Sequence, residues 1–483
     1  MAKRDRDSPT ERSRRAKAKA LERWKAKHPS IERGWRYMAY PSTGQALLLA
    51  SQGHVARACW NYCHEWWGKN RTDERLPAKG ELDEALKVWR EDEEWRKALP
   101  AQACQAVAAH YYEAWKACWA RRSRAPELHA RARTKLSVAV PQARDLKLAR
   151  VSRKFAQVNV PLVGVLRFRY HRPIPANARA AGANLSCEAG RWYLVLKVSL
   201  PEPEPRTPVG ARPVVGYDAG VVLTLAGSDG SSFAHGPWYT EGELRRLYLL
   251  GRQAARRREA RWARSGGKGK GWVGSNERKA YDEMAKVHAT AKRRREDWQH
   301  KVAWEISSTT RCAVFEDLRL AQMTKSARGT VGEPGKNVAQ KAGLNRALLG
   351  EALARLVSKV SYKSEDNGGA TPKVPAPYTS MTCHCCGSCA PGQRESQAWF
   401  RCRDFACGWA GNADYNAACN ILLEALRRGL VPPPFGGTPN AARSRYELEA
   451  WPSVATPVVV AEALSLEGPW MRENVSTQRP LAA

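Results

Sequence analysis

The chain has 483 residues, and its 80 Lys and Arg residues outnumber its 47 Asp and Glu residues to give a formal net charge of +33. This length exceeds one ordinary domain and indicates about three, while the lack of any run of ~18 apolar residues argues against a membrane-spanning helix. With 43% hydrophobic residues the composition is that of a globular protein rather than a disordered basic tail, and the charge surplus favours nucleic acid as the partner.

The beginning of the chain and its cysteine content indicate the compartment. Residues 1–36 are basic throughout and contain no apolar segment of the kind that a secretory signal requires. Of the 13 cysteines, six lie between Cys383 and Cys407, and an odd total does not suit a disulfide framework. We therefore expect a cytoplasmic protein in a reducing compartment, with one metal site and no membrane association.

The first half of the chain divides into helical and strand-rich parts. Residues 34–50 predict a strand, a turn and the start of a helix, and residues 52–122 show three- and four-residue apolar spacings that indicate at least two helices. Several short apolar or alternating runs follow between residues 136 and 200, separated by Pro, Gly and Asn, and these favour a small antiparallel barrel. The Pro-Glu repeat at 201–205 indicates a linker.

The second half begins with an apolar strand at 214–222 and continues with a basic helix pair at 242–308. Residues 241–300 hold seventeen Lys or Arg against eight Asp or Glu, and a Gly-Lys segment at 265–271 predicts a flexible hairpin between the helices. From residue 431 onward the chain has one more acid than base, lacks sustained periodicity and is expected to be poorly ordered. The other predicted elements are a buried strand at 312–315, a helix at about 340–363 and a final helix at 414–428.

Three acidic residues stand where a carboxylate is costly or where an element ends. Asp218 is the polar residue of an otherwise apolar strand, Glu316 follows the buried strand, and Asp414 opens the final helix. Taken singly, each has an ordinary explanation: a turn residue ahead of Gly220, a surface acid at a strand end, and a helix cap. Taken together, they match phosphodiester hydrolysis with two Mg²⁺ ions, because shared carboxylates hold the ions that activate water and stabilise the leaving oxygen.

A cysteine-rich segment precedes the final predicted helix. Cys383-x2-Cys386 and Cys402-x4-Cys407 form two knuckles, each followed by Gly, and this pattern predicts four thiolates placed tetrahedrally around one Zn²⁺. Four cysteine ligands leave no open coordination position, so the zinc is expected to be structural. Three further donors could replace a member of the first pair: His384, Cys385 and Cys389.

At these motifs the chain resembles the transposon-encoded TnpB proteins and the compact type V CRISPR effectors. The second knuckle departs from the family pattern, because four residues stand between its cysteines where two are usual. The resemblance covers roughly residues 35–430. It is carried by residues 215–222, 312–330, 334–349, 379–387 and 400–422, and upstream by residues 99–119, 167–175 and 190–198.

The resemblance implies a multidomain α+β fold. It consists of a wedge β-barrel with a helical recognition insert, and of a split RNase H-like (RuvC) α/β nuclease domain with an inserted zinc ribbon. The expected boundaries are a basic N-terminal arm at 1–34, the wedge barrel at 35–50 and 136–205, the recognition helices at 51–135, the RuvC domain at 206–378 and 412–430, the zinc ribbon at 379–411, and a tail at 431–483.

The resemblance also implies an activity, in which a guide RNA and a short flanking duplex motif direct cleavage of double-stranded target DNA. Asp218, Glu316 and Asp414 would be the catalytic acids and would bind two Mg²⁺ ions. The alternatives are a guide-directed DNA-binding silencer with little or no cleavage and a zinc-ribbon nucleic-acid-binding protein without a guide. We expect a prokaryotic protein; the sequence leaves open whether it serves a transposon or a CRISPR system, and whether it is a monomer or a homodimer on RNA.

Contacts with nucleic acid are expected in the helical parts. The runs Arg256–Arg258 and Lys292–Arg295 would make the basic helix pair a wall of the channel for an RNA–DNA duplex, and a solvated helix face is the alternative. The tryptophans of the first helical block are expected in its core rather than stacked on bases. Gln102 and Gln105 could read adenine edges of the flanking motif.

Overall fold

The computed structural model describes residues 30–72, 76–131, 134–201, 212–265, 273–330 and 332–431. These residues divide into two compact units, one drawn from 1–204 and 247–289 and the other from 205–246 and 290–483. Most of the predicted arm, linker and Gly-Lys hairpin, and the predicted tail after Val431, lie outside the described residues. None of the helices in the described ranges is both long enough and apolar enough to cross a membrane.

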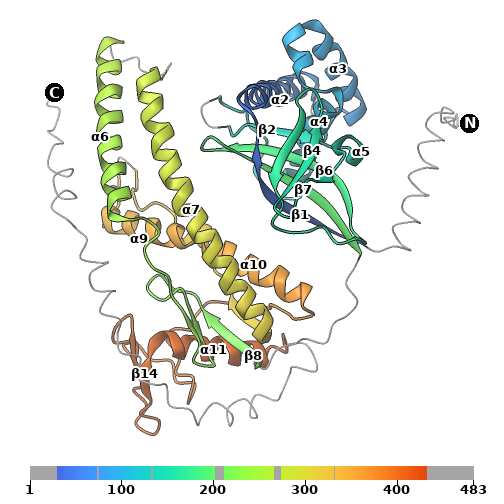
Figure 1. The fold of residues 1–483 in the computed structure, drawn as a ribbon. Helices are drawn as coiled ribbons and strands as arrows, with labels where there is room; N and C mark the ends of the chain where they lie inside the picture. Colours follow the sequence, from blue (N-terminus) through green and yellow to red (C-terminus); the bar gives the residue numbers. More distant parts are fainter. Residues whose placement is uncertain are drawn as a thin grey trace, which may run out of the picture. The chain divides into compact units, whose positions relative to one another are not determined.

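The first unit is built on an antiparallel seven-stranded sheet, in which the longest pairing joins β1 to β7 (Figure 1). Alternate residues of β1, such as Trp35 and Tyr37, point into a core that also holds Phe168 of β5 and Leu194 of β7. The predicted antiparallel strands are thus present, and closure into a barrel stays a prediction, because the order has β2 and β3 at its two edges. The order is β2 (Ser137–Val140), β6 (Arg179–Glu188), β7 (Arg191–Pro201), β1 (Ser30–Tyr40), β5 (Gly164–Arg169), β4 (Phe155–Val160) and β3 (Ala149–Arg150), and the short helix α5 (Ala143–Leu146) follows β2.

A helical block follows β1 in the same unit. The first helix begins at Thr43, within the range predicted for its start, and Ser42 and Gln45 form a reciprocal capping box at its N-terminus. Trp67 lies in the core of the block with 1% of its surface exposed, as predicted, whereas Trp119 is exposed. The helices are α2 (Thr43–Asn70), α3 (Lys79–Asp92), the 3₁₀ helix η1 (Glu94–Ala98) and α4 (Ala101–Trp119).

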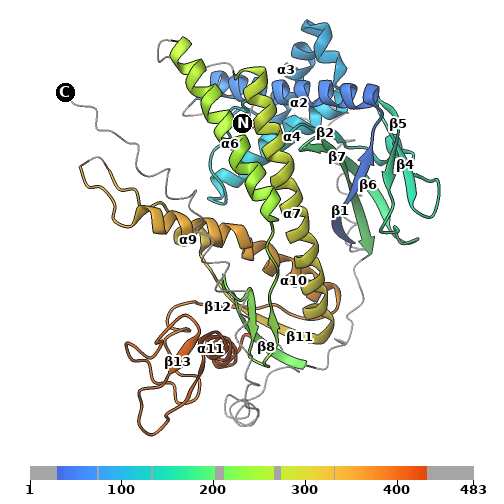
Figure 2. The same ribbon diagram turned by 60° about the vertical axis from the view of Figure 1, so that its left-hand side comes forward.

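The second unit contains a mixed five-stranded sheet with helices on both faces (Figure 2). In the two central strands, Val215 and Phe315 face the helices α7 (Ser275–Thr309) and α10 (Leu353–Asp366), whereas Val214 and Val314 face the helix α11 (Ala413–Arg427). This explains why both strands are almost wholly apolar in sequence. The first strand ends at Asp218 rather than at the predicted residue 222, because the chain turns there toward β9. The sheet order is β10 (Ser232–Phe233), β9 (Leu225–Gly227), β8 (Arg212–Asp218), β11 (Thr310–Glu316) and β12 (Lys373–Val374), with β8, β11 and β12 parallel.

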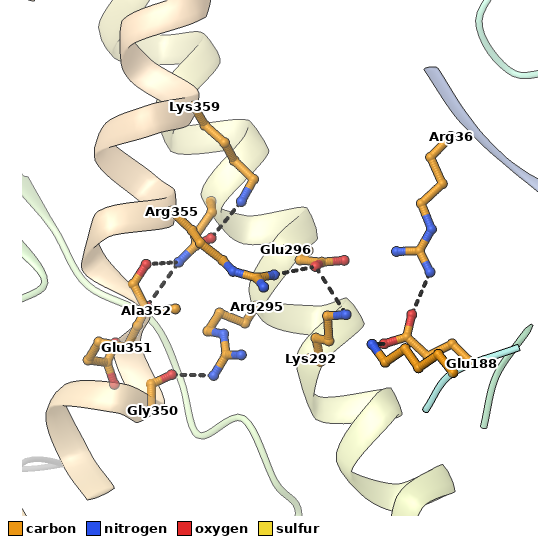
Figure 3. Close-up of polar contacts among 12 residues, drawn as sticks. Arg36, Glu188, Lys292, Arg295, Glu296, Gly350, Glu351, Ala352, Arg355 and Lys359 are labelled. Carbon is orange, nitrogen blue, oxygen red and sulfur yellow. Dashed lines mark hydrogen bonds and ion pairs between the residues drawn. The ribbon is translucent and has the colours of Figure 1, made fainter. Parts of the chain in front are cut away.

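Two long helices, α6 (Glu241–Arg264) and α7 (Ser275–Thr309), correspond to the predicted basic pair. The helix predicted at 340–363 is instead two helices, α9 (Val338–Glu351) and α10 (Leu353–Asp366), separated by Ala352 with φ 51°. Contacts from α7 explain why this break is tolerated. Arg295 donates to the carbonyl of Gly350 (Figure 3), and Gln299 donates to the carbonyl of Glu351 at 2.9 Å. The short helix α8 (Leu320–Met323) precedes this region.

Gly216 sets how closely the final helix, α11 (Ala413–Arg427), approaches β8. A Cβ at Gly216 would lie 2.3 Å from the carbonyl oxygen of Ala418 and 2.8 Å from the amide nitrogen of Leu422, both backbone atoms of α11. Real Cβ atoms do not approach so closely, so a side chain at this position would push the helix away from the sheet.

We therefore expect Gly216→Ala to lower the free energy of unfolding by about 1–3 kcal/mol and to displace the start of α11. Chemical denaturation followed by tryptophan fluorescence measures the change. The matched control is Gly343→Ala in α9, where a Cβ meets nothing within 4 Å and a small gain in stability is expected. Equal stability of Gly216→Ala and the wild type would contradict this packing.

Candidate active site and cysteine cluster

The three acids predicted from the sequence come together at one edge of the second sheet. Asp218 and Glu316 are the last residues of the parallel neighbours β8 and β11, where Tyr217 is in register with Phe315. Asp414 is the second residue of α11, which packs against β8. The first turn of this helix lies at the same edge of the sheet. The carboxyl ends of two strands and the start of a helix therefore place all three carboxylates in one region.

The residue that caps α11 decides whether Asp414 serves as the helix cap, which was its ordinary explanation, or is available to the site. The helix is capped by Asn412, whose Oδ1 accepts hydrogen bonds from the amides of Asp414 at 2.9 Å and Tyr415 at 3.0 Å. The side chain of Asp414 is therefore not the cap. Its Oδ1 instead lies 3.1 Å from Nη2 of Arg394, so it is directed toward a charged partner rather than toward the helix backbone.

Electrostatics shows that the three acids interact. The pKa of Asp218 is raised to about 7, mainly by burial and in addition by the neighbouring Glu316 and Asp414 carboxylates, while Arg394 acts in the opposite direction. Burial also raises the pKa of Glu316 and of Asp414. Three half-buried carboxylates with an arginine beside them form a site in which negative charge is destabilised unless a cation enters.

Two contacts at this site were not predicted from the sequence. Arg394 donates hydrogen bonds to the carbonyls of Gln397 at 2.7 Å and Ser396 at 3.3 Å. These two bonds hold its guanidinium in the position from which it contacts Asp414. The hydroxyl of Thr379 hydrogen-bonds to Oε1 of Glu316. Both residues belong to the cysteine-rich segment, and nothing in their local sequence distinguishes them from other Arg and Thr residues in the chain.

The four predicted zinc ligands form a compact cluster. The Sγ atoms of Cys383, Cys386, Cys402 and Cys407 all lie within 4.8 Å of one another. Two of these separations are 3.5 Å, between Cys386 and Cys402, and 3.8 Å, between Cys383 and Cys407. Tetrahedral Zn–S bonds of about 2.3 Å require sulfur separations of about 3.8 Å, so the donor set fits one Zn²⁺ and is consistent with a zinc ribbon.

The alternative donors of the first knuckle lie outside this group. His384 is directed to α11, where its Nδ1 is 3.0 Å from Oδ1 of Asn416. Cys385 and Cys389 are exposed and are not among the four clustered sulfurs. The geometry therefore favours the two pairs named from the sequence over any substitution by these three residues.

The cysteine-rich segment is attached to α11 by two buried asparagines, and it lies beside that helix in both views (Figures 1 and 2). Asn416 accepts from the amide of His384 at 2.9 Å and donates to the carbonyl of Thr382 at 2.7 Å. Asn420 donates to the carbonyls of Thr382 at 2.6 Å and Thr379 at 2.8 Å. The segment also contains the strands β13 (Trp399–Arg401) and β14 (Ala410–Asn412), and β14 leads directly into α11. The helix α11 thus holds the cysteine-rich segment and also carries one of the three acids.

The basic runs predicted to line a nucleic-acid channel divide into two kinds. Arg256 and Arg258 of α6 are exposed. In α7, however, Arg294 forms an ion pair of 2.6 Å with Glu243, and Arg295 donates to Gly350. Both side chains thus join elements of the protein, and Arg294 is also exposed. Lining of a nucleic-acid channel by these two arginines stays a prediction. Contacts of Gln102 and Gln105 with DNA stay a prediction; the first is half-buried and the second exposed.

Comparison with known proteins places the chain. Residues 354–421, which contain the cysteine cluster and the start of α11, match the family model described as Cas12f1-like, TNB domain. InsQ of Escherichia coli strain K12, designated an RNA-guided DNA endonuclease, is 30% identical over 346 residues, which cover 71% of this chain and 79% of InsQ. A protein of Streptomyces pristinaespiralis with the same designation is 25% identical over 82% of this chain and 90% of its own length.

Shorter or more distant similarities involve CRISPR-associated proteins. The endodeoxyribonuclease Cas12f1 of Sulfoacidibacillus thermotolerans is 45% identical over 71 residues, which cover 15% of this chain and 16% of that protein. A Cas12f1–sgRNA–target DNA complex matches with a TM-score of 0.43 and 13% identity over 84% of this chain and 86% of that one. On the extended similarity to InsQ, the chain belongs to the TnpB/Cas12f-like family of RNA-guided endonucleases.

Proposed function

We propose that the chain is an RNA-guided DNA endonuclease that hydrolyses target DNA at a RuvC-type site formed by Asp218, Glu316 and Asp414. The observation that carries this proposal is the convergence of the three carboxylates, which come from two strand ends and a helix start that lie about a hundred residues apart in the chain. The mixed sheet that presents them supports assignment of the unit as a split RNase H-like nuclease domain, with the zinc ribbon inserted ahead of α11.

The three acids would hold two Mg²⁺ ions. Carboxylate oxygens are the ligands that Mg²⁺ prefers, and the raised pKa of Asp218 shows a site that disfavours its own negative charge without a cation. Bound there, the ions would activate water and stabilise the leaving oxygen. Arg394 supplies a fixed positive charge beside Asp414, where it would orient a phosphate, and Thr379 holds the Glu316 carboxylate in place.

Guide RNA and double-stranded target DNA are the proposed partners. Base pairing between guide and target would read the sequence, while the protein would supply positive charge along the duplex. The net charge of +33 and the exposed Arg256 and Arg258 support this division of labour. One structural Zn²⁺ on the four clustered cysteines would hold the ribbon against α11 and so keep Arg394 and Thr379 at the acids.

The test is to express the chain together with the non-coding DNA that flanks its gene, and to sequence any RNA that copurifies. A discrete RNA is expected, and its complex should linearise a plasmid that carries the matching sequence when Mg²⁺ is present and not when EDTA is added. A complex that binds this plasmid without cutting it would favour a guide-directed silencer. Absence of a discrete RNA would favour a zinc-ribbon nucleic-acid-binding protein without a guide.

A further inference from the structure

The second knuckle of the ribbon presents Phe405 to solvent. Its relative exposure is 106%, whereas the next most exposed large hydrophobic residue in the described part of the chain, Val88, reaches 73%. Phe400, five residues earlier in the same hairpin, is fully buried. A large, fully exposed aromatic side chain therefore lies at a defined point of the ribbon, where a ligand that covered it would bury its apolar surface.

The turn that carries Phe405 is well defined by hydrogen bonds. Oδ1 of Asp404 accepts from the amide of Ala406 at 3.0 Å, and the carbonyl of Asp404 accepts from the amides of Cys407 at 3.1 Å and Gly408 at 3.0 Å. The knuckle has four residues between its cysteines, two more than the first knuckle, and Phe405 lies among them. The side chain is thus displayed by a hydrogen-bonded turn whose two ends belong to the cysteine cluster.

The surroundings of Phe405 favour nucleic acid over protein as the ligand. Arg401 and Arg403 flank it and are both exposed, although Nε of Arg401 also lies 3.5 Å from Oε1 of Glu395. The adjacent acid, Asp404, uses its carboxylate within the turn. An aromatic ring between arginines is the combination by which proteins bind single strands, with the ring stacked on a base and the cations near the phosphates. A protein partner would be expected to need a wider apolar patch than one ring.

The ribbon also places Phe405 close enough to the three acids for one bound nucleic-acid strand to contact both. β13 and β14 pair from Trp399 with Asn412 to Arg401 with Ala410, and Asn412 caps the helix that carries Asp414. The knuckle continues from the other end of this hairpin. At about 3.3 Å per residue, Phe405 lies roughly 10–20 Å along the hairpin from the cap, a distance that a few nucleotides can span.

We propose that Phe405 stacks on a base of the single-stranded DNA that enters the site, and that it fixes the strand a few nucleotides from the acids. This inference rests on the proposed nuclease function for its choice of ligand. It is tested by binding rather than by cleavage, so that the two can fail separately.

The experiment uses the full-length Asp218→Ala chain loaded with zinc and a mixed-sequence single-stranded oligodeoxynucleotide that contains 5-iodouracil. Irradiation links this base to an aromatic ring stacked on it, and mass spectrometry locates the linked residue. We expect the linkage at Phe405. Phe405→Ala should weaken binding of the oligonucleotide about 5- to 100-fold, because one stacked base contributes about that much, and Phe405→Trp should restore it.

The matched control is Trp304→Ala, which removes an aromatic side chain with 64% exposure from α7 and should leave affinity unchanged. Zinc content and thermal unfolding of each variant report whether the ribbon is intact. Linkage elsewhere, or equal affinities of Phe405→Ala and the parent, would overturn the proposal even if the wild-type complex cuts DNA. Conversely, linkage at Phe405 in a protein that never cuts would support the stacking contact and contradict the nuclease function alone.

Discussion

Asp218→Asn is expected to lower the rate of target cleavage by at least about a thousand-fold while leaving binding of RNA and DNA close to wild type. The half-buried side chain lies beside Glu316 and Asp414, and asparagine has nearly the same shape, so the exchange removes a carboxylate from the shared site without opening a cavity. Metal ions in such sites contribute several kcal/mol of charge stabilisation to the transition state, and each 1.36 kcal/mol is a factor of ten in rate. Single-turnover cleavage of a labelled target, with affinity measured in parallel by gel shift, separates the two effects.

The matched control is Asp317→Asn, which neutralises the acid next to Glu316. Asp317 is exposed and lies one position beyond the end of β11, where its amide donates to the carbonyl of Val374 at 2.8 Å. Cleavage by this variant is expected to stay within about threefold of the wild type, because an exposed charge outside the site has little effect. A cleavage rate for Asp218→Asn equal to that of Asp317→Asn would show that the three-acid cluster is not the catalytic centre.

Cys402→Ser is expected to remove zinc from the purified protein, unfold the ribbon and abolish cleavage even when Mg²⁺ is present. Structural zinc supplies much of the folding free energy of small ribbons, about 10–16 kcal/mol in zinc-finger peptides. Loss of cleavage should follow because the ribbon contributes Arg394 and Thr379, which contact two of the three acids. Elemental analysis should find one zinc per chain in the wild type and much less in the variant.

Cys385→Ser and Cys389→Ser are the controls for this experiment, because both sulfurs are exposed and stand outside the cluster in the same short segment. Each should retain one zinc per chain and cleave like the wild type. If Cys389→Ser lost zinc as completely as Cys402→Ser, the assignment of the four ligands would be wrong. A wild-type protein that folds and cuts after complete removal of zinc would refute the structural role.

Several parts of the site could be predicted because their chemistry is local in the sequence. The apolar runs around Asp218 and Glu316 identify strands buried on both faces, so an acid at either end stands out. The two cysteine knuckles name their ligands by spacing alone, and the clustered sulfurs agree with that choice. The position of Asp414 at the start of a helix was also predicted, and the structure shows that Asn412 caps this helix.

Other features depend on contacts between distant segments and have no local signal. The break at Ala352 occurs at a residue with good helix propensity, and it is stabilised by Arg295 and Gln299 from another helix. The basic run in α7 looks like a ligand surface in sequence, yet Arg294 pairs with Glu243, which lies 51 residues away. A charge run cannot reveal which of its members is used internally.

The sequence by itself determined the family resemblance, the three acids, the four cysteines and the preference for a polyanion, because each depends on residue type and spacing. Only the tertiary structure decided that Arg394 faces Asp414, that Thr379 holds Glu316, and that Gly216 lets α11 lie against β8. The physical reason is that these contacts form only when the ribbon, the sheet and the last helix pack together, and the residues that make them are ordinary in composition. The fold likewise decides how the positive charge is used, since some arginines, such as Arg294, form ion pairs between elements of the protein.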